Sequence, residues 1–83
     1  MKGKVLIVSP RCPSCEVLKK KLEQKGILDR YEIIDVGTPE GMKFARNMDI
    51  RAVPECAIVE GEGKVKTVRI CSEAEWKEML AEI

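Results

Sequence analysis

Hydrophobic residues along the chain occur in short clusters, and their spacing predicts the order of strands and helices. The unbroken apolar run of residues 5–8 predicts a buried strand over residues 4–8, and residues 31–35 have strand character as well. Between them, apolar residues at helical spacing predict a helix that begins near Glu16, runs to Lys25 and ends at Gly26. Its apolar side consists of Cys15, Val17, Leu18 and Leu22.

Two further helices are indicated by their N-terminal caps. Thr38 and Pro39 suit the cap and the first position of a helix. We assign the buried side of this helix to Met42, Phe44, Ala45 and Met48. Ser72 with Glu75 forms a capping box before a last helix. The apolar residues of that helix are Trp76, Met79, Leu80 and Ile83, which we interpret as core.

Between these two helices, residues 56–60 and 64–70 flank Gly61-Glu62-Gly63, which indicates a β-hairpin. The predicted order is therefore βαβαββα, an α/β fold in a single domain that spans residues 1–83. The first strand–helix–strand unit should cross over right-handed, and the hairpin should join the same sheet because an isolated ribbon is marginal in water. We expect a four-stranded mixed sheet with helices on both faces.

Charge excludes some classes of partner. The chain has 15 Lys and Arg against 14 Asp and Glu, so its net charge of +1 gives no electrostatic reason to expect nucleic acid or a membrane. No apolar stretch reaches membrane-spanning length, and the one that follows the charged start of residues 1–4 is too short for a signal peptide. We expect a monomer in the cytoplasm, where paired cysteines are more often catalytic or metal-binding than structural.

The motif Cys12-Pro13-Ser14-Cys15 lies between the first predicted strand and the first predicted helix. Three residues span about one helical turn, so both sulfurs can approach at the helix start. The unpaired amides and the positive end of the helix dipole there favour a thiolate over a thiol. Because the thiolate is the nucleophile of thiol–disulfide exchange, both the residue types and their position favour a redox function.

The two cysteines of this motif are expected to play different roles. Cys15 lies on the apolar side of the predicted helix and should point inward, whereas the sulfur of Cys12 can meet solvent and the free amides. We therefore predict that Cys12 is the attacking thiolate and that Cys15 resolves the mixed disulfide. Pro13 suits the helix start, and the positive charge of Arg11 should further favour the thiolate.

Over nearly its whole length the chain resembles the thioredoxin superfamily, and within it the small glutaredoxin-like proteins. The resemblance rests on the C-x-x-C after the first strand, on Val53-Pro54 before the third strand, and on the element order. The stretch of residues 9–15, Ser-Pro-Arg-Cys-Pro-Ser-Cys, is more similar to a glutaredoxin motif than to the Trp-Cys-Gly-Pro-Cys of thioredoxins. The resemblance implies an oxidoreductase that needs no cofactor, acts on disulfides of protein substrates and receives electrons from a partner reductase.

The resemblance also assigns a substrate-binding surface. On its own, Val53-Pro54 reads as an ordinary strand boundary. With the C-x-x-C upstream, we expect a cis peptide bond there, with Pro54 beside the active cysteines and the backbone of Val53 open to an extended substrate. We expect Arg11 and Pro13 to complete this surface.

Two departures from the family pattern limit what can be carried over. Glutaredoxins have Gly-Gly followed by Asp near the start of the last helix, which helps to hold glutathione, whereas residues 69–73 here read Arg-Ile-Cys-Ser-Glu. Thioredoxins have a buried carboxylate on the first strand, and residues 4–8 contain none. We therefore expect weak use of glutathione, all the more because Glu73 brings a negative charge toward the site of an anionic tripeptide.

Other functions stay open at this stage. A C-x-x-C can be half of a zinc or iron–sulfur site, so a metal- or cluster-binding module on the same fold is the main alternative. We favour redox chemistry and assign no metal ligand, because the two remaining cysteines form no second C-x-x-C and the chain has no His. A non-enzymatic adaptor is a third possibility, which the intact Cys12 and Cys15 argue against.

Those remaining cysteines are Cys56 and Cys71. If the hairpin turns at Gly61-Glu62-Gly63, Glu60 faces Lys64, and the two cysteines are about three residues out of register. That offset is roughly 10 Å along a strand and too long for a disulfide. We therefore expect Cys56 to be a buried, inert thiol. Cys71 is either a small packed residue or a third thiol near Cys12.

Overall fold

The computed structural model describes residues 3–82, and its elements follow the predicted order. The bounds are β1 Lys4–Val8, α1 Pro13–Gln24, β2 Tyr31–Asp35, α2 Pro39–Asn47, β3 Glu55–Glu62, β4 Val65–Ile70 and α3 Glu73–Ala81, with a short 3₁₀ turn at Leu28–Arg30. The first two strands have the predicted bounds, and the capping box of Ser72 with Glu75 is confirmed. Ile83 lies outside the described residues.

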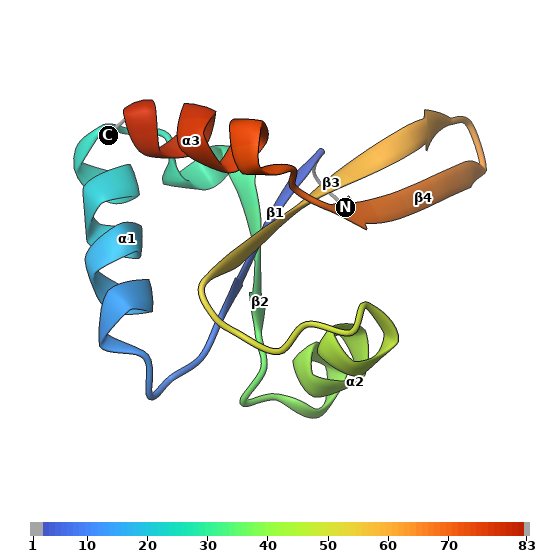
Figure 1. Cartoon of the computed structure of the whole chain (residues 1–83), viewed down its shortest axis with the longest axis horizontal. Helices are drawn as coiled ribbons and strands as arrows, with labels where there is room; N and C mark the ends of the chain where they lie inside the picture. Colours follow the sequence, from blue (N-terminus) through green and yellow to red (C-terminus); the bar gives the residue numbers. More distant parts are fainter. Residues whose placement is uncertain (1–2, 83) are drawn as a thin grey trace.

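The four strands form one mixed sheet in the order β2-β1-β3-β4 (Figure 1). β1 runs parallel to β2, and β3 is antiparallel to both of its neighbours, β1 and β4. This arrangement confirms the predicted α/β architecture. In Figure 1 the β3–β4 hairpin extends away from α1 at the upper right.

Alternate residues of β1 face two separate cores, because successive side chains of a strand point to opposite faces of the sheet. Leu6 and Val8 lie on the face covered by α1 and α3, in a cluster whose helical members include Leu18, Leu22 and Met79. Val5 and Ile7 lie on the other face, against which Phe44 of α2 packs. Helices therefore cover both faces, as predicted.

The helix caps work as the sequence indicates, but three helical side chains, Val17, Met42 and Leu80, are more exposed than predicted. The Thr38 hydroxyl accepts a hydrogen bond of 3.0 Å from the amide of Gly41. Gly41 is buried so closely against the Asp35 backbone that any β-carbon there would collide with it. Met42 is 45% exposed and Leu80 is 42% exposed, so their assignment to the core was wrong. Ala45 and Met79 are buried as expected.

The hairpin has a different register from the predicted one. Gly61 lies within β3, and the two-residue loop is Gly63-Lys64, where Gly63 has the positive φ of 62° that such loops require at a glycine. Glu60 therefore faces Thr67 rather than Lys64, a shift of three residues.

This shift brings Cys56 and Cys71 opposite each other, and the prediction that they are too far apart for a disulfide was wrong. The amide of Cys71 donates a hydrogen bond of 3.0 Å to the carbonyl of Cys56. Their Cα atoms are 5.4 Å apart, and the two sulfurs form a disulfide. Cys56 is buried as predicted, with 3% exposed, but it is not a free thiol.

The start of α3 is fastened to the hairpin by one arginine. Arg69 of β4 pairs with Glu60 of β3 and with Glu75 in the first turn of α3. Glu75 also accepts a hydrogen bond of 2.9 Å from the amide of Ser72. These donors, the guanidinium first, lower the pKa of Glu75 from 4.5 to about 2.

We therefore predict that Glu75→Gln lowers the midpoint of thermal unfolding at neutral pH. A carboxylate whose pKa is lower in the folded than in the unfolded protein stabilises fully above its unfolded pKa and loses that effect as the pH falls through its folded pKa. Between pH 4.5 and about pH 2 the midpoints of wild type and variant should converge.

Glu73→Gln is the matched control, because Glu73 lies in the same turn and pairs only with the exposed Lys77 in the described chain. Its midpoint should stay close to that of wild type. A gap between Glu75→Gln and wild type that stays constant down to about pH 2 would contradict the assigned pKa.

Candidate active site at the start of helix α1

Cys12 occupies the N-cap of α1, a position that usually belongs to Ser, Thr, Asp or Asn. Its backbone is extended, with φ −113° and ψ 102°, and its Sγ accepts a hydrogen bond of 3.1 Å from the amide of Cys15. Pro13 follows at the first helical position, where a missing amide hydrogen costs nothing. The sulfur thus takes one of the amides that the helix leaves unpaired, and the same amide can stabilise a thiolate.

The two motif cysteines differ in exposure, and they lie within bonding reach. Cys15 is 0% exposed and belongs to the core between the sheet and α1, whereas Cys12 is half-buried. Their Cα atoms are 5.2 Å apart, and their sulfurs form a disulfide. The prediction that Cys15 points inward is confirmed, and Cys12, which is half-buried, packs against the edge of the same core.

The loop before β3 supplies the second side of this site. The Val53–Pro54 peptide bond is cis, as predicted. The carbonyl oxygen of Val53 lies 3.8 Å from the Sγ of Cys12, although 41 residues separate the two in sequence. The pairing of β1 with β3 explains this proximity, because Ile7 faces Glu55 and the chain continues from these residues to Cys12 and back to Val53.

Arg11 lies at the exposed rim of the site. Its amide donates a hydrogen bond of 3.3 Å to the Ser9 hydroxyl, which shapes the loop before Cys12. Its guanidinium has no ion pair with any carboxylate whose side chain the structure describes. The positive charge next to Cys12 in the sequence is therefore not neutralised by a neighbour in the described chain.

An apolar groove beside the cysteines was missed by the sequence reasoning. It has a volume of about 390 Å³ and runs between the first turns of α1 and the outer side of α3. Its lining includes Pro13, Val17, Pro54, Trp76 and Leu80. Val17, predicted on the apolar side of α1, is 52% exposed and lines this groove instead of the core. Leu80, interpreted as core, lines this surface instead.

The cysteines do not gather into a metal-binding cluster in the part of the chain that is described. Cys12 pairs with Cys15 and Cys56 with Cys71. No group of three or more His, Cys, Asp or Glu side chains within residues 3–82 is arranged to hold a metal ion. In the same residues, no helix is long and apolar enough to cross a membrane.

Comparison with solved structures places this architecture among known folds. A thioredoxin from Thermus thermophilus, solved in solution, is similar with a TM-score of 0.67 and 21% sequence identity, covering 94% of this chain and 70% of the thioredoxin. The structure of a malarial protein is similar with a TM-score of 0.54 and 10% identity, covering 95% of this chain and 92% of that protein. No protein-family model and no curated protein matches the sequence. The chain has a thioredoxin-like fold.

We predict that alkylation of the fully reduced protein labels Cys12 well before Cys15. The helix-start amide should hold the pKa of the Cys12 thiol below its ordinary value of about 8.5, while Cys15 is shielded by the core. Iodoacetamide labelling near neutral pH, mapped by mass spectrometry, measures both rates. The denatured protein is the control and should label both cysteines equally. Preferential labelling of native Cys15 would reverse the assignment.

Proposed function

We propose that this protein is a dithiol–disulfide oxidoreductase that reduces or exchanges disulfides in protein substrates. The observation that carries the proposal is the Sγ of Cys12 at the N-cap of α1, where it accepts the Cys15 amide while the Cys15 sulfur lies buried behind it. A nucleophile and a resolving thiol thus lie within one turn of the same helix. The thioredoxin-like fold supports the same chemistry.

In the first step, the Cys12 thiolate attacks one sulfur of a substrate disulfide. A bond forms between Cys12 and that sulfur, the substrate disulfide breaks, and the other substrate sulfur leaves as a thiolate that takes up a proton. The amide of Cys15 stabilises the attacking thiolate before this step. The exposed guanidinium of Arg11 adds positive charge at the rim where the substrate arrives.

In the second step, Cys15 releases the substrate. Its thiol loses a proton, and the thiolate attacks the Sγ of Cys12 in the mixed disulfide. The remaining substrate sulfur leaves, and Cys12–Cys15 becomes a disulfide, so two electrons pass to the substrate. A partner reductase restores the dithiol with two electrons and two protons.

The substrate is an extended segment that lies across the Val53–Pro54 loop. The carbonyl of Val53 already lies beside Cys12, so a substrate backbone placed there brings its sulfur to the nucleophile. Pro13 and Pro54 border the apolar groove, which suits an apolar side chain close to the substrate cysteine. We propose that the protein acts as a monomer in the cytoplasm.

We expect Cys12→Ser to abolish insulin reduction, because no nucleophile remains at the helix start. Cys15→Ser should instead accumulate a mixed disulfide between Cys12 and the substrate, visible by non-reducing electrophoresis and mass spectrometry. The matched control is the double variant Cys56→Ser/Cys71→Ser, which removes the other disulfide and should keep most of the activity. Activity that survives in Cys12→Ser but disappears in this double variant would move the catalytic role to the other pair.

We also predict that glutathione is a poor electron donor. Residues 69–73 lack the Gly-Gly and Asp by which glutaredoxins help to hold glutathione, and Glu73 brings a negative charge toward the site of an anionic tripeptide. Turnover of a glutathionylated peptide with glutathione reductase should be far slower than that of a glutaredoxin measured in parallel. Insulin reduction with thioredoxin reductase as the alternative donor completes the comparison. Turnover of the glutathionylated peptide at the same rate as the glutaredoxin would contradict the prediction.

A further inference from the structure

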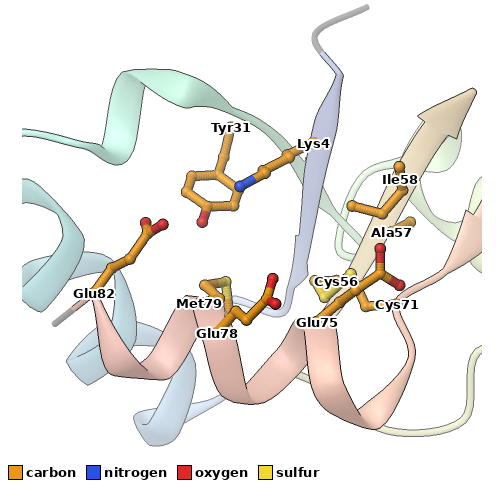
Figure 2. A pocket seen from close by; sticks show the side chains of 10 residues that line it. All are labelled: Lys4, Tyr31, Cys56, Ala57, Ile58, Cys71, Glu75, Glu78, Met79 and Glu82. Atoms are coloured by element: carbon orange, nitrogen blue, oxygen red, sulfur yellow. A yellow bond between two sulfur atoms is a disulfide. The ribbon is translucent and has the colours of Figure 1, made fainter.

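A second, smaller pocket lies on the other side of α3 and has the Cys56–Cys71 disulfide in its lining (Figure 2). Its volume is about 70 Å³, which is room for a molecule of a few heavy atoms. It shares no lining residue with the groove beside Cys12. Glu78 of α3 and Glu82 at its C-cap enclose it from one side, and Lys4 and Tyr31 enclose it from the sheet.

The Tyr31 hydroxyl is a polar group of this pocket that can hydrogen-bond to a ligand. Tyr31 is only 4% exposed, and its hydroxyl makes no hydrogen bond within the described chain. Figure 2 shows the hydroxyl pointing from β2 toward α3, into the pocket. No buried side-chain oxygen or nitrogen of the described chain lacks a partner, so the Tyr31 hydroxyl oxygen is reached by solvent. A ligand that enters the pocket can hydrogen-bond to it in place of water. Burial, and then the charge of Glu82, raise the pKa of Tyr31, so the hydroxyl stays protonated at neutral pH.

The charges around the pocket favour a cation. Three carboxylates line it, and Lys4 is the single basic residue of the lining. Glu75 is already paired with Arg69, but Glu78 and Glu82 have no ion pair among the described side chains, which are those of residues 3–82 except 62, 65 and 66. The ammonium of Lys4 lies over the Tyr31 ring, 5.9 Å from its centre. The carboxylates of Glu78 and Glu82 therefore attract a positively charged group to the opening of this pocket.

The disulfide in the pocket has one sulfur that is easier to reach. Cys56 is 3% exposed, whereas Cys71 is half-buried at the end of β4. Exchange depends on access as well as on the nucleophile. A thiol that enters the pocket therefore attacks Cys71, and Cys56 is the leaving sulfur.

We propose that this pocket is a second redox site, at which a small cationic thiol binds and exchanges with the Cys56–Cys71 disulfide. The ligand class is an aminothiol. Its ammonium group pairs with Glu78 and Glu82 and donates a hydrogen bond to Tyr31. A short apolar stem joins the ammonium to a sulfur that faces Cys71. The protein then has two disulfides with different reagents, one for protein segments at Cys12 and one for small thiols at Cys71.

The reaction is a two-step reduction. The aminothiol loses its thiol proton, its sulfur bonds to the Sγ of Cys71, the Cys56–Cys71 bond breaks, and Cys56 leaves as a thiolate that takes up a proton. A second aminothiol thiolate attacks the ligand sulfur of this mixed disulfide and releases Cys71, which is protonated in turn. Two aminothiols become one disulfide, and the two electrons remain on Cys56 and Cys71 as thiols.

The test measures reduction of Cys56–Cys71 by three small thiols of different charge: cysteamine, mercaptoethanol and mercaptoacetate. The full chain carrying Cys12→Ser and Cys15→Ser isolates this disulfide, and mass mapping of wild type follows the same bond. Each rate is divided by the thiolate concentration. It is then divided by the rate at which the same thiol reduces a small, uncharged disulfide free in solution, which corrects for the intrinsic reactivity of the thiol. Cysteamine should be faster than mercaptoacetate by roughly tenfold at low salt, with mercaptoethanol between them and the difference reduced at high salt.

Glu78→Gln and Glu82→Gln should each reduce the preference for cysteamine, and Tyr31→Phe should slow cysteamine more than mercaptoethanol. Glu40→Gln, on α2, is the matched control and should leave the preference unchanged, because Glu40 does not line this pocket. Equal normalised rates for the three thiols would overturn the proposal. So would a native disulfide that resists all three of them. Neither result bears on insulin reduction by Cys12, so the two functions are tested separately.

Discussion

The burial of β1 on both faces is the constraint on which the rest of the structure depends. Val5, Leu6 and Ile7 are 0% exposed, which requires a helical layer on each side of the sheet. The strands that flank β1 bring the Tyr31–Asp35 run to one edge and the hairpin to the other. The chain then leaves β1 at its carboxyl end and enters α1 through Cys12, so the same strand that organises the core also positions the proposed nucleophile.

The candidate site is built from two chain segments, neither of which is sufficient alone. The helix start offers the Cys15 amide to the Cys12 sulfur, and the loop before β3 places the Val53 carbonyl on the other side of that sulfur. The β1–β3 pairing fixes their separation, because both segments leave the sheet at the same end. A slip of that pairing would turn alternate residues of β3 to the wrong face and would displace Val53 as well.

Local signals made most of the fold and the primary site predictable, whereas features that depend on register or on packing between distant elements were not. The buried run of β1 and the capping box at Ser72 each specify structure within a few residues. The hairpin loop was ambiguous because Gly61 and Gly63 both suit a turn, and choosing Gly63-Lys64 shifts the register by three residues and creates the Cys56–Cys71 disulfide. The apolar groove depends on where α3 lies against α1, which no local pattern states.

Different sides of helix α3 line the surface next to each of the two disulfides. Met79 is buried against the sheet, Trp76 and Leu80 line the groove that leads to Cys12, and Glu78 and Glu82 line the pocket at Cys71. Residues four apart share a side of a helix, so one side is apolar and the other acidic. The surface near Cys12 therefore has the apolar lining that suits the proposed protein substrates, whereas the pocket at Cys71 has the acidic lining that suits the proposed aminothiol. Since Arg69 holds the first turn of α3 to the hairpin, the same ion pairs keep both surfaces in position.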